Sequence, residues 1–245
     1  MSGWYVFGVA DAGLAVELEG LRLVREGQLA AVVAPVDADE FTEEQLNDRP
    51  WLEEKVLAHE DVLSRYLREG PVVPLRFGAI YRQLDEVVEL LGERRDELTQ
   101  DLERVRGRVE LGVKGWVDRR GLEETLARKR AMSPTSAPGR AYLERRQAER
   151  YVAAEASTLL ADVARSVHAR LAELAVAAVA NRPQPPELTG RAEQMFLNTA
   201  YLVPAADEAM RREVGALDEQ HRELGLSFET TGPWPPYNFV GREEP

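Results

Sequence analysis

The pattern of apolar and polar positions predicts alternating strands and helices along the chain. Aromatic and β-branched residues run from Trp4 to Val9, which indicates a strand. Apolar runs at 21–24 and 29–36 flank Gly27, which can adopt positive φ, so a hairpin is expected there. Pro35 would end the second of these strands near a sheet edge, because proline cannot donate to a strand ladder.

Helical periodicity begins after the hairpin. Thr42 and Gln45 have the spacing of a capping box, so residues 37–47 form either a short helix or a solvated acidic loop. Residues 50–69 predict a long helix that begins with a proline, which the first turn tolerates, and ends before Gly70. Its expected apolar face consists of Trp51, Leu52, Val56, Leu57, Val62, Leu63, Tyr66 and Leu67.

The first half of the chain closes with a strand and a second helix. Residues 72–78 predict a buried strand, although Pro74 weakens the prediction of a central position. Residues 84–105 show helical spacing again. Gly92 interrupts this helix at a cost of about 1 kcal/mol relative to alanine.

The second half repeats the alternation. Residues 108–118 alternate with period two and predict a strand, which a short helix follows. The segment 132–139, rich in Pro and Ser, is the best candidate for a flexible loop. Residues 193–204 predict a half-buried strand, 205–224 a helix with a narrow apolar face, and 226–231 a last strand.

Residues 139–180 hold the longest helical pattern, and prolines from Pro183 onward end it. The expected apolar stripe consists of Val152, Ala156, Leu159, Val163, Val167, Leu171, Leu174 and Ala178. Because this stripe is rich in Ala and Val and poor in Leu, it favours a helix packed on a sheet over a dimeric coiled coil.

This order of elements predicts an α+β fold with two domains. Each domain is expected to be a sheet with helices on one face, an α+β sandwich of ferredoxin-like kind. The expected boundaries are 1–106 for the first domain and 107–231 for the second. An extended tail rich in proline and aromatic residues would follow at 232–245.

Composition excludes several classes of function. Apolar residues make up 44% and charged residues 30% of the 245 residues, which is typical of neither disordered nor membrane proteins. No apolar run approaches the roughly 20 residues that span a bilayer, and the N-terminus predicts a strand, not a signal peptide. The net charge of −12 argues against nucleic acid as a partner. The chain has no cysteine, which excludes disulfides and is compatible with a cytoplasmic location.

Catalytic motifs are missing from the sequence, so we expect no enzyme, no cofactor and no metal site. The chain has no phosphate-binding glycine loop, dinucleotide fingerprint, zinc-protease histidine pair or nucleophile elbow. Its three histidines, His59, His168 and His221, lie in predicted helices among charged neighbours. His59 is followed by Glu60 and Asp61, but consecutive helix residues point in different directions, so a structural role for His59 is favoured.

Two cations and the C-terminal segment are less ordinary. Arg76 and Lys114 lie in apolar strand segments, where an internal ion pair is favoured over an anion site. Trp234, Tyr237 and Phe239 lie among prolines that exclude a helix or an interior strand. Docking of this segment on the chain's own body is favoured over display to a partner. In the docked case, Trp234→Ala would cost about 3–5 kcal/mol.

Five segments together resemble the gas vesicle accessory protein F/L family, in order and over nearly the whole chain. The last of them, with its Gly-Pro-Trp-Pro-Pro-Tyr-Asn-Phe run, is similar to the family's most distinctive signature. The segments are Trp51–Glu54 with His59, Val73–Gly78, Val109–Lys114, Pro138–Leu143 and Thr231–Val240.

The resemblance implies an assembly factor or minor component of gas vesicles. Such a protein would contact the hydrophobic shell protein, prevent its aggregation during nucleation, and meet other accessory proteins. It implies a vesicle-associated, cytoplasmic protein with two α+β domains, the second ferredoxin-like, and no catalytic residue or cofactor. We expect an apolar groove where the first sheet meets the tail. Candidates for structural or partner contact are Arg76, Phe77, Lys114, Tyr142, Trp234, Tyr237 and Phe239.

Two other readings stay open at this point. The chain could be a small-molecule enzyme or an anion-binding protein that uses Arg76 or Lys114. It could also be a scaffold that self-associates through its long helix.

Overall fold

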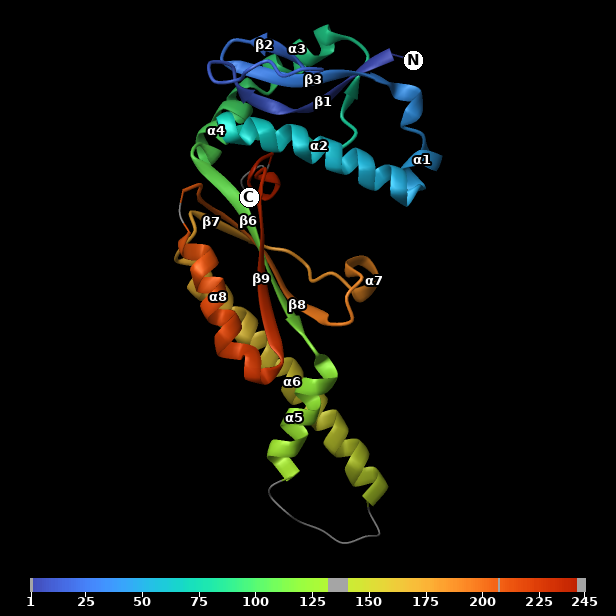
Figure 1. Cartoon of the computed structure of the whole chain (residues 1–245), viewed down its shortest axis with the longest axis vertical. Helices are drawn as coiled ribbons and strands as arrows, with labels where there is room; N and C mark the ends of the chain where they lie inside the picture. Colours follow the sequence, from blue (N-terminus) through green and yellow to red (C-terminus); the bar gives the residue numbers. More distant parts are fainter. Residues whose placement is uncertain (1, 132–140, 207, 242–245) are drawn as a thin grey trace. The chain divides into compact units, whose positions relative to one another are not determined.

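The computed structural model describes residues 2–131, 141–206 and 208–241 (Figure 1). The chain divides into two units. The first contains residues 1–110 together with 233–245, and the second contains residues 111–232. The expected loop at 132–139 lies outside the described residues.

The first unit is built on an antiparallel sheet with β1 at its centre. The spatial order is β2-β3-β1-β4, and β5 also pairs with β1. Since β3 pairs along the whole of β1, β4 and β5 share the opposite edge, opposite Gly8–Ala10 and Trp4–Tyr5 respectively. The strands are β1 (Ser2–Asp11), β2 (Arg22–Glu26), β3 (Leu29–Asp37), β4 (Val72–Pro74) and β5 (Ile80–Tyr81).

The expected hairpin is confirmed. Gly27 joins β2 to β3 with φ of 59°, a conformation that glycine adopts without strain. Pro35 lies within β3, not after it. The pairing of β2 with β3 ends at Val33, so Pro35 sits where that edge of β3 is open.

Helices cover both faces of the first sheet, which corrects the expectation of one covered face (Figure 1). On β3, Ala31 and Val33 pack with α3 (Leu84–Glu93) and α4 (Arg95–Val105). Val32 between them packs with α2 (Arg49–Glu69) on the opposite face. Because both faces are buried, β3 is apolar at consecutive positions.

The helix predicted over residues 50–69 is confirmed as α2, but its buried face differs from the predicted one. His59, Leu63 and Tyr66 are its buried residues, and Leu57 is 69% exposed. Positions 59, 63 and 66 share one helical face, and position 57 lies off it. Gly8 of β1 makes the close packing possible, because a Cβ there would lie 2.8 Å from the Leu63 side chain.

Short helices lead into α2. The segment holds η1 (Ala38–Glu40) and α1 (Glu43–Asn47). The Gln45 amide donates to the Thr42 hydroxyl at 3.2 Å, so the helical alternative for this stretch is confirmed. Farther along, the helix expected over 84–105 is broken into α3 and α4 at Arg94, two residues beyond Gly92.

The second unit is built on a sheet of order β7-β8-β6-β9. Helices pack on this sheet, so both units have an α+β fold (Figure 1). Its strands are β6 (Arg108–Val117), β7 (Ala177–Ala180), β8 (Gln194–Pro204) and β9 (Leu226–Trp234). Its helices are α5 (Arg119–Ala131), α6 (Ala141–Ala172), α7 (Pro186–Thr189), α8 (Ala209–His221) and η2 (Arg222–Leu224).

The helix expected over 139–180 is shorter than predicted. It ends at Ala172, and Ala177–Ala180 form β7, antiparallel to β8. Alanine favours a helix, but four consecutive pairs with β8 override that local preference. The buried side of α6 consists of Val152, Ala156, Leu160, Val163, Val167 and Leu171.

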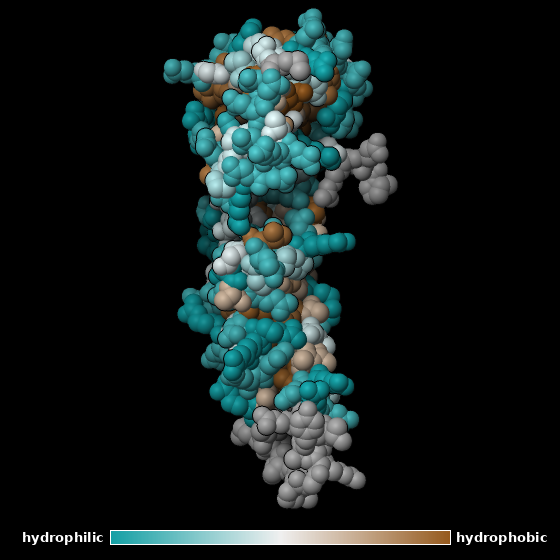
Figure 2. Space-filling model, turned by 90° about the vertical axis from the view of Figure 1, so that its right-hand side faces the viewer, coloured by the Kyte–Doolittle hydropathy of each residue, from teal (hydrophilic) through white to brown (hydrophobic). Residues whose placement is uncertain are grey.

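The end of the chain is less extended than expected. Strand β9 continues through Pro233 to Trp234, and η3 (Tyr237–Phe239) forms a short 3-10 turn. Within the described ranges, no helix has the length and apolar character needed to cross a bilayer. Figure 2 shows hydrophilic residues over most of one face, with hydrophobic residues in separate patches.

Candidate functional site

Carboxylates of three elements hold the C-terminal segment on the first unit. Glu60 comes from α2, Asp101 from α4 and Glu110 from β6. Asp101 and Glu110 are almost fully buried, at 3% and 6% exposure. Each of the three accepts a hydrogen bond from a residue between Tyr237 and Gly241. Sequence reasoning missed these acids, although Asp101 shares the apolar helix face of Leu98 and Leu102.

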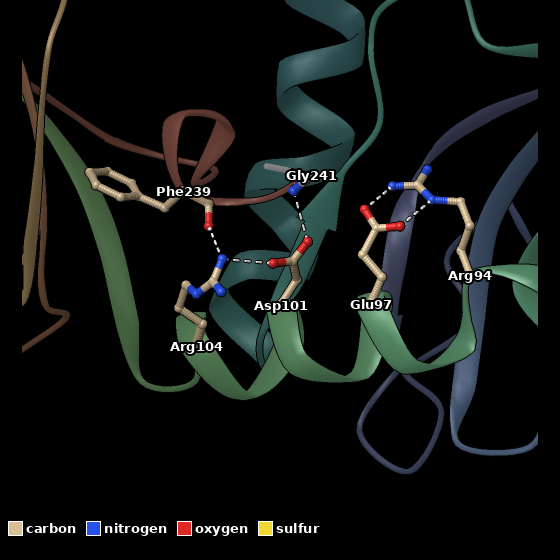
Figure 3. Close-up of polar contacts among 6 residues, drawn as sticks. All are labelled: Arg94, Glu97, Asp101, Arg104, Phe239 and Gly241. Atoms are coloured by element: carbon tan, nitrogen blue, oxygen red, sulfur yellow. Dashed lines mark hydrogen bonds and ion pairs between the residues drawn. The ribbon is translucent and has the colours of Figure 1, made fainter. Parts of the chain in front are cut away.

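Asp101 joins the tail to α4 (Figure 3). It accepts from the Gly241 amide at 2.8 Å and from Arg104 Nη1 at 3.1 Å. The same Arg104 nitrogen donates to the Phe239 carbonyl at 3.2 Å. Burial raises the pKa of the Asp101 carboxyl, and the Gly241 amide and Arg104 oppose that effect. The tail backbone therefore satisfies a carboxylate that would otherwise be buried at a cost.

Glu110 and Glu60 bind the preceding residues. Asn238 donates to Glu110 with its amide at 2.9 Å and its side-chain nitrogen at 2.6 Å. The Tyr237 hydroxyl donates to Glu60 Oε1 at 2.7 Å. Burial raises the pKa of both Glu60 and Tyr237, so this pair lies out of water.

The aromatic residues of the tail divide into docked and exposed. Phe239 is 5% exposed, and Val240 packs on the core of the first sheet. Tyr237 packs on the α2 side of that sheet. Trp234 is 41% exposed. The favoured expectation that the segment docks on its own body therefore applies to Tyr237 and Phe239 more than to Trp234.

A pocket of about 460 Å³ lies where β4 meets the tail, inside the first unit. Arg76, Arg94, Tyr237 and Gly241 are among the residues that line it. Arg94 is engaged by Glu97 through two contacts, at 2.9 and 2.6 Å (Figure 3). Arg76 is exposed and forms no ion pair within the described part of the chain, so the internal ion pair expected for it is wrong. Its strand is three residues long and ends before Arg76.

Lys114 also lacks the expected partner. It is half-buried on β6 and makes no ion pair with any residue that the structure describes. Sequence reasoning missed its neighbour on the strand, Trp116, which stacks under the Arg191 guanidinium at 4.2 Å. Arg191 in turn pairs with Glu229 at 2.9 Å. Tyr142 lies within α6, and its side chain is outside the described residues.

Phe77 and His59 belong to an aromatic cluster on the α2 side of the first sheet. His59 is 2% exposed, and its Nδ1 lies 2.9 Å from the Tyr5 hydroxyl. That hydroxyl accepts from the Gly78 amide at 3.1 Å. Burial lowers the pKa of His59 to about 4, and the Leu75 backbone offsets part of this effect. His59 is therefore neutral at pH 7. In the described ranges, no group of His, Asp and Glu is arranged to hold a metal ion.

Comparison with known proteins gives this architecture a context. A family model described as "Gas vesicle synthesis protein GvpL/GvpF" matches residues 3–241. Gas vesicle protein L of Streptomyces sp. (strain CB03234) is 35% identical over 91% of this chain and 84% of its own. Gas vesicle protein F of the same strain is 27% identical over 96% of this chain and 98% of its own.

Solved structures show the same fold. The crystal structure of GvpF from Anabaena sp. PCC7120 superposes with a TM-score of 0.72. At 16% identity, it covers 100% of this chain and 98% of its own. That of GvpF from Microcystis aeruginosa gives a TM-score of 0.65 at 20% identity, over 97% of this chain and 98% of its own.

The chain thus has the two-unit α+β fold of the solved GvpF structures. The chain belongs to the GvpL/GvpF family of gas vesicle synthesis proteins, and the predicted resemblance is confirmed. The family consists of structural gas vesicle proteins and not of enzymes, which confirms the expectation that this chain is not an enzyme.

Proposed function

We propose that this protein is an accessory factor of gas vesicle assembly that binds the hydrophobic shell protein and prevents its aggregation during nucleation. The observation that carries the proposal is the family match over residues 3–241. Other vesicle accessory proteins are its further expected partners. We place its action in the cytoplasm at the growing vesicle.

The charge and the surface of the chain are compatible with such a carrier. With a net charge of −12, copies of the protein repel one another while each holds an apolar client. A pocket beside Arg76 lies near the position expected for the client groove, where the first sheet meets the tail. Since Arg76 and Arg94 line that pocket, it is less suited to an apolar group than the aromatic cluster around His59.

A refolding experiment tests the proposal. The shell protein from the same gene cluster is diluted out of denaturant in the presence of this protein, and light scattering is followed. We expect equimolar protein to suppress scattering and to co-purify with the shell protein. The heat-unfolded chain serves as the control for nonspecific effects. Scattering unchanged by the folded protein, together with no co-purification, would contradict the proposed function.

Anion binding remains a second candidate because of Arg76. Arg76 lines a pocket of about 460 Å³ and has no carboxylate partner among the described residues. A thermal-shift screen against small carboxylates and phosphates tests this idea, since a ligand of the native state raises the midpoint. Arg76→Gln should remove any such shift, and a shift that survives the substitution would argue against the site.

Self-association through the long helix has less support. The apolar side of α6 packs within the second unit, so it is not free to form a seam with another copy. Light scattering over a range of protein concentrations distinguishes a self-associating scaffold from the proposed assembly factor. A mass that rises with concentration would favour the scaffold.

We also infer that the second unit is ferredoxin-like. The strand order β9-β6-β8-β7, with helices after β6 and β8, supports this inference. Long-range NMR contacts between β6 and β8 would test it.

A further inference from the structure

We propose that an aromatic pocket on the α2 side of the first sheet receives one bulky apolar side chain of the shell protein. The pocket lies between α2 and strands β1 and β3, entirely within the first unit. The identity of the partner rests on the proposed function. The size and chemistry of the occupant come from the pocket itself.

Five aromatic rings form the pocket. They belong to Tyr5, Phe7, Phe41, His59 and Phe77. Neighbouring ring centroids lie 4.8–6.1 Å apart, for example 5.6 Å between Phe7 and His59 and 6.0 Å between His59 and Phe77. Rings at this spacing are in mutual contact, so the wall is preformed and a partner would not have to order it.

The volume of the pocket selects a small apolar group. It measures about 140 Å³. A dry protein cavity of roughly 150 Å³ lined by apolar side chains binds benzene. The pocket therefore fits one phenylalanine ring or one branched aliphatic side chain, and it is too small for a longer segment of chain.

The polar groups of the wall are mostly occupied. The Tyr5 hydroxyl accepts from the Gly78 amide and lies 2.9 Å from His59 Nδ1. His59 is neutral at pH 7 and only 2% exposed, so its ring offers water little polar surface. Lys55, the charged lining residue, pairs with Glu40 at 3.7 Å and lies over the Trp51 ring. Water would find few partners in this pocket, which favours an apolar occupant.

The surface beside the pocket supports docking by a protein and not by a free small molecule. Phe41 and Phe77 also line a second hollow of about 440 Å³, together with Leu46 and Ile80. Leu46 is 41% exposed. Arg82 also lines this hollow, so its surface is mixed, and a pocket for a single anchor with a partly polar rim is the usual arrangement of a protein–protein hot spot. One apolar side chain of a shell subunit would fill the pocket, and its neighbours would cover the hollow beside it.

Ala58 provides a selective test. It is exposed on α2 and lines the pocket, so Ala58→Leu would place a branched side chain at the opening without disturbing the helix. Ala161→Leu is the matched control, because Ala161 is exposed on α6 in the second unit. Both variants should keep the circular dichroism and the unfolding midpoint of the original chain.

Two probes are applied to the three proteins. Benzene, followed by saturation-transfer NMR, reports on the pocket alone. Immobilised shell protein reports on docking. We expect the original chain and Ala161→Leu to bind both probes. Ala58→Leu should lose the benzene signal and bind the shell protein about tenfold or more weakly, as loss of an anchor residue does.

The outcomes distinguish failure of the pocket from failure of the proposed function. If Ala58→Leu binds the shell protein as well as the original chain does, the inference is overturned while the proposed function stands. If the original chain does not bind benzene, the pocket is not a site for an apolar group and the inference also fails. If the original chain ignores the shell protein, the proposed function fails, whatever benzene does.

Discussion

Asn238 donates two hydrogen bonds to the carboxylate of Glu110, one from its backbone amide and one from its side chain. The two residues are 128 positions apart in the sequence. The bidentate contact fixes the tail against β6 at a carboxylate that is only 6% exposed. A charged acceptor with two donors is among the stronger hydrogen-bonded arrangements in proteins.

Removal of this acceptor should destabilise the first unit. Glu110→Ala leaves both Asn238 donors without their partner, at an expected cost of about 1–3 kcal/mol in the free energy of unfolding. Urea denaturation followed by circular dichroism measures the change. Glu89→Ala, on the exposed side of α3, is the control and should change stability by less than about 0.5 kcal/mol. Equal effects of the two substitutions would show that the Glu110 contact adds nothing.

Phe239 should matter more than Trp234. Phe239 is 5% exposed and Trp234 is 41% exposed. Phe239→Ala should therefore cost about 3–5 kcal/mol, limited by the free energy with which the tail docks. Trp234→Ala should cost less than the 3–5 kcal/mol expected from the sequence, because the residue is 41% exposed in the folded chain. Thermal unfolding of both variants gives the comparison, and a larger loss for Trp234→Ala would contradict it.

Glu60 should destabilise the folded chain at neutral pH. Its folded pKa is raised by burial, so the folded state holds the proton at a pH where the unfolded state has released it. Its contribution to stability therefore falls as pH rises through the folded pKa. Glu60→Gln keeps an oxygen for the Tyr237 hydroxyl and carries no charge. We expect this variant to equal or exceed the original chain in stability at pH 7.

That advantage should shrink as the pH falls through the raised pKa of Glu60. Unfolding midpoints in a series of buffers from neutral to acidic pH provide the measurement. If the stability advantage of Glu60→Gln instead grows on acidification, the pKa of Glu60 is not raised in the folded chain and the prediction is wrong.

His59 should make the first unit sensitive to acid. The pKa of His59 is about 4 in the folded chain and 6.5 for a histidine without contacts, as in the unfolded chain. Between these two pH values the unfolded state therefore binds more protons than the folded state. Stability is lost as the pH falls from about 6.5 to about 4, by up to about 3 kcal/mol from this group. His59→Asn, which can still accept from the Tyr5 hydroxyl, should show a flatter profile over this window. His221→Gln, in the second unit, is the control for loss of a histidine elsewhere.

The sequence predicts most elements of this fold because their signals are local. The hairpin at Gly27, the capping box at Thr42 and the strand over 194–204 each depend on a few neighbouring residues. The sequence predicts a helix over residues 177–180 because alanine favours one, and only the pairing with β8 makes them a strand. Non-local pairing of this kind has no signature in the segment itself.

The candidate site was predicted less well, for the same reason. Tyr237 and Phe239 were singled out because exposed aromatic residues are costly. The acids that receive the tail come from three distant elements, and nothing near them in the sequence identifies their partners. Arg76 was expected to be buried because its neighbours are apolar, but β4 ends at Pro74 and the arginine turns to water. His59 is hidden in a charged stretch, and its burial follows from the face that α2 presents to the sheet.

The return of residues 233–241 to the first unit has a consequence for synthesis. The ribosome makes the sheet and helices of that unit first, but Val240 packs on its core only after the intervening unit has been translated. At roughly 5–20 residues per second, the intervening stretch of about 120 residues takes roughly 6–24 s. During that interval Asp101 and Glu110 have no tail donors. A chain that ends before residue 237 lacks these tail contacts permanently, so only full-length molecules reach full stability.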